Sequence, residues 1–144
     1  MKVAIKKLRD NAELPGYQTS GSAAADISAC LDEPITLQSG ERRVIPTGFA
    51  LSIPVGYEAQ IRARSGLASR HGICMANGIG TIDSDYRGEV GVIVVNLGQE
   101  SYTISPGARI AQMAVVRCEQ ATWEEVDQLD TTDRGAGGYG STGL

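Results

Sequence analysis

The chain has 144 residues, of which 42% are hydrophobic, and its formal net charge at pH 7 is −4. That length fits one domain with a sizeable core, and no apolar run approaches the roughly 20 residues that cross a bilayer. The negative balance argues against nucleic-acid binding through a basic face, which depends on neutralising many phosphates. A small phosphorylated ligand needs only a few local arginines and therefore stays possible.

The N-terminus and the cysteines bear on location and metal chemistry. The first residues, MKVAIKKLRDN, carry many charges and no apolar core of a signal peptide, so we expect a cytoplasmic protein. Cys30, Cys74 and Cys118 are odd in number and lack CxxC spacing. They favour reduced, mostly buried thiols over a disulfide framework or a zinc site. His71 is the only histidine, which excludes a metal centre built on several histidines.

Alternation with period two dominates the chain and predicts strands rather than helices. The predicted strands cover residues 3–8, 33–38, 42–54, 57–64, 89–98, 101–104 and 108–118. One helix is predicted over 65–72, whereas 122–129 is either a turn of helix or an acidic connector, and the composition from Asp130 onward is typical of a loop. Short strands separated by turn signals indicate a closed β-sandwich or barrel without a second domain.

The stretch RARSGLASRHG joins the end of a predicted strand to the predicted helix. Serine is a favoured N-cap, so we expect Ser65 to cap this helix, and Gly66 allows the backbone to approach a ligand closely. Free N–H groups at the helix start, a hydroxyl and the Arg64 guanidinium would together form an anion site. The other interpretation is a plain capped helix beside a solvated arginine.

The stretch NGIGTIDSDYRGE, residues 77–89, predicts a hairpin whose tip is opened by glycine. Asp83 follows Thr81 and Ile82, which are typical of a short strand edge, and a carboxylate held there can act as a general base on water. Aspartate is also an ordinary turn residue, so a structural role stays open. An EF-hand is excluded, because no further carboxylates follow at the spacing of a calcium loop.

Two further stretches offer groups to a phosphorylated ligand. Gln112 interrupts the apolar stretch GARIAQMAV, either as a satisfied amide or as a ligand donor. The glycine-rich end, RGAGGYGSTGL, cannot bury enough surface to order alone, yet Arg134, Tyr139 and a Ser-Thr pair suit a lid that orders on binding. Backbone N–H groups of such segments can wrap phosphates, although a Walker-type GxxxxGK[ST] pattern is absent.

From about Gly21 to Gly143, the chain resembles the homotrimeric deoxyuridine triphosphatase (dUTPase) family. Five stretches match the motifs of that family in order and at family-like separations: GSAAADISA, RSGLA, NGIGTIDSDYRGE, ARIAQ and RGAGGYGSTG. Each motif is weak alone, whereas the ordered set is very specific.

The resemblance implies an all-β fold, a distorted jelly-roll-like β-barrel with one short helix and a flexible Gly-rich C-terminal arm. Residues 1–130 would form the barrel domain, and residues 131–144 a mobile lid within the same functional domain. The implied reaction is Mg²⁺-dependent hydrolysis of dUTP to dUMP and pyrophosphate, which supplies dUMP for thymidylate synthesis and keeps uracil out of DNA. The implied assembly is a homotrimer with shared active sites. No nucleic-acid or membrane partner is expected.

The resemblance also assigns roles to individual residues. Asp83 would be the general base that orients the attacking water, and Asp26 would have a supporting role. The uracil and deoxyribose would be contacted by Asn77, Gly80, Thr81, Ile82, Tyr86 and Tyr139. The phosphates would be held by Arg64, Ser65, Gly66, Gln112, Arg134, Gly138, Ser141 and Thr142. Tyr86 would lie under the sugar and leave no room for a 2′-hydroxyl, and Mg²⁺ would be held by the triphosphate and waters, without direct protein ligands.

The chain departs from the family pattern in three places. Ala24-Ala25 stand where the family usually has a glycine, Tyr139 stands where phenylalanine is commoner, and RCEQATWEEV lacks a proline that often follows the fourth motif. Tyr139 can still stack on a base, because tyrosine and phenylalanine both present a π-face. The missing proline affects the path expected for residues 117–130, not the chemistry.

Two alternatives stay open within the same fold. A dCTP deaminase or a bifunctional deaminase–diphosphatase would need a glutamate beside the pyrimidine in a different hairpin sequence from IDSDYRG. A catalytically silent regulatory protein would be expected to lack the water-orienting carboxylate or the lid, and this chain has both.

Overall fold

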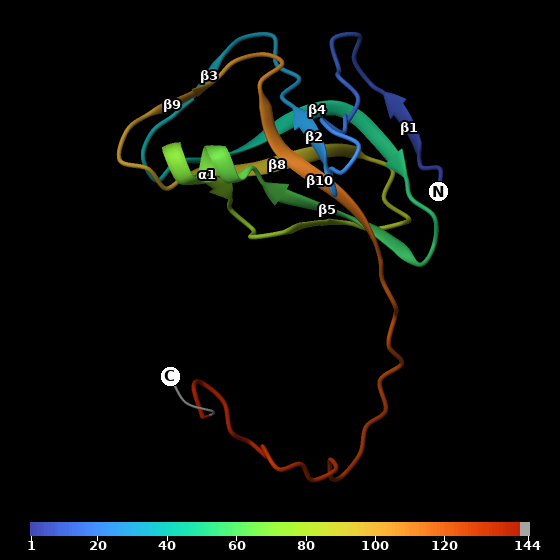
Figure 1. Ribbon diagram of the computed structural model, residues 1–144. Helices are drawn as coiled ribbons and strands as arrows, with labels where there is room; N and C mark the ends of the chain where they lie inside the picture. Colours follow the sequence, from blue (N-terminus) through green and yellow to red (C-terminus); the bar gives the residue numbers. More distant parts are fainter. Residues whose placement is uncertain (142–144) are drawn as a thin grey trace.

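The structure, a computed structural model, describes residues 1–141 and consists mainly of strands and loops (Figure 1). Its elements are, in chain order, β1 (Ala4–Lys7), β2 (Ala25–Ser28), β3 (Ile35–Leu37), β4 (Arg42–Ser52), β5 (Tyr57–Ala63), α1 (Ser65–His71), β6 (Ile73–Met75), β7 (Gly80–Ile82), β8 (Glu89–Asn96), β9 (Tyr102–Ile104) and β10 (Arg109–Arg117). The predicted helix and all seven predicted strands have counterparts here. Strands β2 and β6 do not appear among the predictions, because β2 is buried at all four positions and β6 has only three residues.

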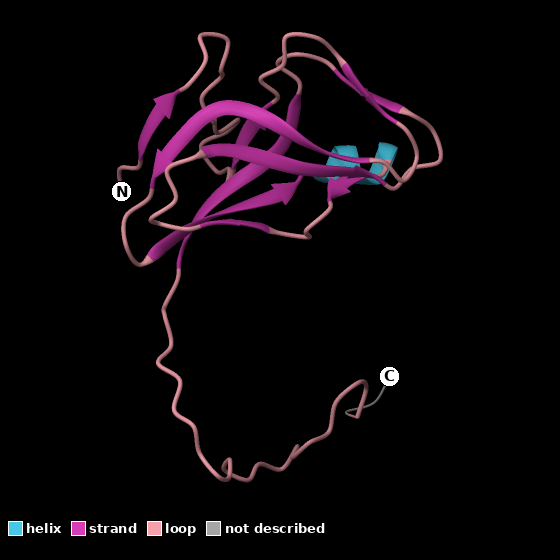
Figure 2. Ribbon diagram, turned by 180° about the vertical axis from the view of Figure 1, so that it is seen from behind, coloured by secondary structure: helices cyan, strands magenta, loops and turns pink. Residues whose placement is uncertain are grey.

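Two four-stranded antiparallel sheets pack around one hydrophobic core (Figure 2). Their strand orders are β1-β4-β8-β6 and β2-β10-β5-β7, and β3 pairs with β9 in a separate ribbon. Fully buried side chains such as Phe49, Ile27 and Val92 come from both sheets, and each contributes about 1.5–3 kcal/mol by leaving water. The predicted all-β fold with one short helix is confirmed. Within residues 1–141 no strand ladder joins the two main sheets, so they are open rather than closed by hydrogen bonds.

The sheet β2-β10-β5-β7 carries four of the five motif stretches. Asp26 lies on β2 and Gln112 on β10, where the two are register partners. Arg64 follows β5, and Asp83 follows β7. Because β10 pairs with both β2 and β5, Asp26, Gln112 and Arg64 meet at one end of this sheet. Asp83 lies toward the other end, because Ile82 pairs with Ala59 and Gly80 with Ile61.

The cysteines form no disulfide, as the sequence predicts. Cys30 is buried, and its thiol donates to Asn11 Oδ1 at 3.1 Å. Cys74 and Cys118 are only half-buried, so the prediction of mostly buried thiols holds for one of the three.

No helix within residues 1–141 combines the length and the apolar character that a membrane crossing requires.

Beyond β10 the chain leaves the sheets as an extended arm, drawn in orange and red in Figure 1. The Cys118 N–H donates to the Gly56 carbonyl at 3.0 Å, and from there to residue 141 every hydrogen bond stays within the arm. Trp123 and Leu129 are 91% and 84% exposed. Residues 122–129 contain no helix. Of the two predictions for this segment, the acidic connector is therefore confirmed and the turn of helix is wrong.

Candidate active site

A buried carboxylate connects three strands at one end of the second sheet. The Asp26 side chain is only 4% exposed. Its Oδ1 accepts a hydrogen bond from Gln112 Nε2 at 3.0 Å, and its Oδ2 accepts one from Arg109 Nη1 at 2.9 Å. Arg64 Nε lies 3.5 Å from Asp26 Oδ1. The structure thus brings together Asp26, Gln112 and Arg64, which were predicted site residues. It also places Arg109 there, which was not among the predicted site residues.

The start of α1 differs from the prediction in one respect. The N-cap is Arg64, with an extended backbone (φ −81°, ψ 126°), and no side chain caps the helix. Ser65 is therefore the first helical residue rather than the cap, because the helix begins directly after the extended residue 64. Ser65 and Gly66 are exposed, so the hydroxyl of Ser65 is accessible to a ligand.

Asp83 is exposed at the end of β7, whose residues pair with β5. β6 and β8, which flank β7 in the sequence, pair with each other in the opposite sheet. Residues 77–89 therefore cross between the sheets, and the predicted hairpin is wrong. Gly78 makes this path possible, because its φ of +71° turns the chain sharply after β6. The crossing presents the Asp83 carboxylate to solvent directly after a hydrogen-bonded strand.

The residues assigned to uracil lie along the same crossing. A Cβ at Gly80 would lie 3.3 Å from Asn77 Nδ2 and 3.2 Å from Ile61 Cβ, so the small residue leaves room for the amide. Thr81 is exposed and Ile82 half-buried. The structure therefore groups the four candidates of this segment around β7.

Tyr86 is held in place by its neighbours. Its N–H donates to the Asp83 carbonyl at 3.2 Å, and its hydroxyl donates to the Glu89 carbonyl at 3.0 Å. A Cβ at Gly88 would lie 2.6 Å from Tyr86 Cζ, so glycine at 88 allows the ring to lie against the backbone. The ring is 45% exposed and thus offers a fixed apolar surface beside Asp83.

The arm residues lie apart from the rest. Arg134 Nε donates to the Gly137 carbonyl at 2.9 Å, and the Ser141 N–H donates to the Gly138 carbonyl at 3.1 Å. Tyr139 is fully exposed with a φ of 49°. Thr142, the remaining predicted phosphate-binding residue, lies outside the described residues.

A cavity of about 810 Å³ opens beside Asp83 and has the size of a small-molecule site. It is lined by residues 55–58, 83–85, Cys118 and Gln120. None of the predicted phosphate-binding residues in the described part of the chain lines it. Within one chain the predicted residues form three groups: those around Asp26, those between Asn77 and Tyr86, and those of the arm.

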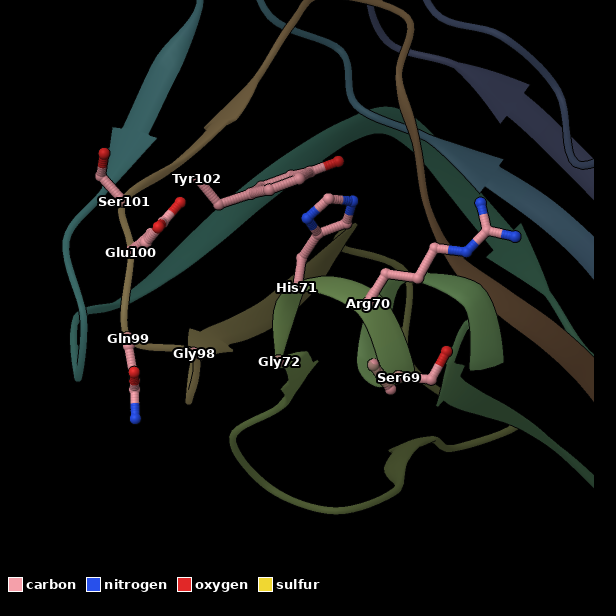
Figure 3. A pocket seen from close by; sticks show the side chains of 10 residues that line it. Ser69, Arg70, His71, Gly72, Gly98, Gln99, Glu100, Ser101 and Tyr102 are labelled. Carbon is pink, nitrogen blue, oxygen red and sulfur yellow. The ribbon is translucent and has the colours of Figure 1, made fainter.

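A second cavity, of about 360 Å³, lies at the C-terminal end of α1 (Figure 3). The His71 ring faces Tyr102 there, with centroids 4.9 Å apart and planes tilted by 44°. No predicted site residue within residues 1–141 lines this cavity. The single histidine thus packs on an aromatic ring rather than among the predicted phosphate-binding residues.

The fold is an open β-sandwich. It carries an arginine–carboxylate cluster at Asp26, an accessible aspartate at position 83 and a glycine-rich arm outside the sheets. These features suit the class of proteins that bind a small phosphorylated ligand. The family model described as dUTPase matches residues 10–143. The chain belongs to the dUTPase family, which confirms the resemblance seen in the five motifs.

Curated relatives match nearly the whole chain. A deoxyuridine 5'-triphosphate nucleotidohydrolase of Roseobacter denitrificans is 60% identical over 131 residues, which cover 90% of this chain and 86% of the relative. A relative of the same name from Fusobacterium nucleatum is 54% identical over 143 residues, which cover 99% of this chain and 98% of the relative.

Solved structures share the fold. The Staphylococcus bacteriophage 80alpha dUTPase with dUpNHpp has a TM-score of 0.90 at 27% identity, and the match covers 99% of both chains. A dUTPase from phage phi11 of S. aureus, described with a structural Mg(II) ion, has a TM-score of 0.82 at 24% identity, covering 91% of this chain and all of that one.

Proposed function

We propose that this protein hydrolyses dUTP to dUMP and pyrophosphate by attack of water on the α-phosphorus. Family membership and the names of the relatives support the reaction. The structural observation that carries it is Asp83, an exposed carboxylate at the end of a paired strand beside a cavity of about 810 Å³.

In this mechanism Asp83 accepts a proton from the attacking water. The water oxygen forms a bond to the α-phosphorus, the bond from that phosphorus to the α,β-bridging oxygen breaks, and pyrophosphate leaves. Positioning and neutralisation of charge supply most of the rate in such reactions. A correctly placed base contributes on the order of 10²–10⁴-fold.

The phosphates would be bound by two sets of donors. The first set belongs to the sheet end, where Arg64 and Gln112 are held by Asp26 and where Ser65 and Gly66 are exposed. The second set comes from the arm and consists of Arg134, Gly138, Ser141 and Thr142. Because the arm makes no hydrogen bond to the sheets between residues 119 and 141, it would add its donors only on closing over the substrate. Tyr139 would then stack on the face of the uracil ring, and Asn77 and the β7 residues would contact the edge of that ring.

Tyr86→Ala is expected to weaken the preference for dUTP over UTP by on the order of 10²-fold, because the ring would no longer exclude the 2′-hydroxyl. The ratio of kcat/KM values for the two nucleotides measures this. Tyr86→Phe is the control, since it keeps the ring and removes only the hydroxyl that donates to the Glu89 carbonyl. Unchanged discrimination in Tyr86→Ala would show that another residue excludes the 2′-hydroxyl.

Mg²⁺ is the proposed metal, bound by phosphate oxygens and water. Within residues 1–141 no group of three or more His, Cys, Asp or Glu side chains is suited to hold a metal. The Asp26 carboxylate is almost completely buried and accepts a hydrogen bond at each oxygen, so we propose that it acts on the ion through water rather than directly. Mg²⁺ commonly keeps several waters and relies on substrate phosphates, and its charge would neutralise those phosphates.

The proposed assembly is a homotrimer whose sites are shared between subunits. The separation of the predicted residues into three groups supports sharing, because a second chain can complete each site. Val44 and Ile93, which are register partners on β4 and β8, are 64% and 36% exposed. Together with Trp123 and Leu129 on the arm they leave apolar surface of the kind that marks protein interfaces. A solution mass near three times 15.2 kDa is the expected result.

A cytoplasmic location is proposed as well. Three free cysteines suit a reducing compartment. There the enzyme would supply dUMP for thymidylate synthesis and keep uracil out of DNA.

The function is tested by measuring pyrophosphate release with Mg²⁺ from dUTP, dCTP, dTTP and UTP. Release from dUTP alone is expected. Ammonia release from dCTP would instead identify a deaminase, and tight dUTP binding without turnover would identify a silent regulatory protein.

A further inference from the structure

We propose that Arg109 is a positioning residue that acts through Asp26 on the phosphate-binding groups Arg64 and Gln112. This inference rests on the proposed function for its kinetic consequences. The Asp26 carboxylate is almost completely buried. Arg109 occupies Oδ2, and this leaves Oδ1 to face Gln112 and Arg64.

A bulge in β10 places Arg109 at this carboxylate. Side chains of a regular strand alternate between faces, so residues 109 and 112 would point to opposite sides. The register with β2 shifts between them, since Arg109 pairs with Ser28 while Ala111 pairs with Ile27. A bulge adds one residue to a strand and re-aims the side chains beyond it. Both side chains therefore reach the same Asp26 carboxylate.

Arg64 is held from two directions. Its Nη1 donates to the main-chain carbonyl of Arg109 at 3.0 Å. Its Nε is buried and, within residues 1–141, has no hydrogen-bond partner, although it lies 3.5 Å from Asp26 Oδ1. An unpaired buried donor is unfavourable, so Arg64 would gain by moving closer to Asp26. The hydrogen bonds of Arg109 and Gln112 to the carboxylate oppose this movement, because they fix its orientation.

The arrangement also sets the local charge. Two guanidinium groups surround one carboxylate, so the cluster carries a net positive charge toward a phosphate. With an uncharged residue at position 109, the charges of Asp26 and Arg64 would cancel, and Arg64 would be free to form a closer ion pair with Asp26. Arg109 therefore keeps Arg64 available to substrate.

Arg109→Met is expected to lower kcat/KM for dUTP by on the order of 10-fold or more, the size expected from weakening one charged hydrogen bond. Arg109→Lys should restore part of the loss, because it retains the charge without the fork geometry. Arg109→Met also leaves Oδ2 of the buried Asp26 without its hydrogen-bond partner, so a lower unfolding midpoint is expected, and kinetics are compared at a temperature where all variants are folded. Lys7→Met, which removes an exposed charge on β1, is the matched control and should keep full activity.

A double-mutant cycle separates positioning from direct contact. If Arg109 acts through Asp26, Arg109→Met should cost much less in an Asp26→Asn background than in the wild type. Equal losses in both backgrounds would overturn the proposal, as would an unchanged kcat/KM in Arg109→Met.

A second readout does not depend on turnover. The Nε–Hε NMR signal of Arg64, assigned by its loss in Arg64→Lys, should shift in Arg109→Met as Nε closes on Asp26, and should shift less in Arg109→Lys. An unmoved signal would contradict the proposal. Absence of dUTP hydrolysis by the wild-type protein would refute the proposed function instead, and the signal would still decide whether Arg109 positions Arg64.

Discussion

Asp83→Asn is expected to lower kcat for dUTP by on the order of 10²–10⁴-fold while the substrate still binds, because an amide cannot accept the proton of the attacking water. Each tenfold loss corresponds to about 1.4 kcal/mol of transition-state stabilisation. The substitution preserves the size of the side chain, and Asp83 is exposed, so the fold should not change. Single-turnover kinetics with excess enzyme measures the chemical step, and equilibrium binding of dUTP measures affinity.

The same loop provides the control. Asp85 is also exposed and lines the same cavity, so Asp85→Asn removes an equal charge two residues away. It should retain nearly normal turnover. If the two variants lose activity equally, the effect is a general one of charge beside the phosphates, and Asp83 is not the base. Near-normal turnover by Asp83→Asn would rule out that role directly.

The strands were predictable where a side-chain pattern reports burial on one face. In β5, for example, buried Ala59 and Ile61 alternate with half-buried Gln60 and Arg62. β2 is different, because its polar residues Asp26 and Ser28 are buried together with Ala25 and Ile27. The apolar–polar alternation of these four residues therefore does not report a strand with one covered face. Long strands with one covered face are thus readable from the sequence, whereas the short edge strands β2 and β6 are not.

The hairpin prediction failed for a different reason. Residues 77–89 contain the glycines and aspartates of a turn, and turns do occur at Gly78 and between Asp83 and Tyr86. Local turn chemistry does not specify which strands pair across it. Here β7 pairs with β5, and this long-range choice carries the chain from one sheet to the other.

The site residues were predictable as types, but their grouping was not. Asp26 and Gln112 are far apart in the chain and meet only because β2 and β10 are neighbours in register. Arg109 reaches them through a bulge, and no spacing rule in GARIAQ indicates one. The motif ARIAQ includes Arg109, but its contact with Asp26 follows from the structure alone.

Removal of residues 134–144 is expected to lower kcat/KM for dUTP by on the order of 10²-fold or more, comparable to the loss of one or more transition-state donors. The truncation removes Arg134, Tyr139 and the Ser-Thr pair, which would close over the phosphates and the base. A closed lid also excludes water, and this strengthens every charge interaction inside the site. The loss should therefore exceed that of Arg134→Met in the full-length chain, which removes one charge and leaves the lid.

The truncated chain should remain folded. Its removed residues make hydrogen bonds only within the arm over the described part, 134–141, and Tyr139 is fully exposed. The apolar connector residues Trp123 and Leu129 are retained, so the assembly state should not change either. Thermal unfolding and solution mass test these points beside the kinetics. A truncated chain that unfolds, or one that hydrolyses dUTP as fast as the full-length protein, would show that the arm is not a lid.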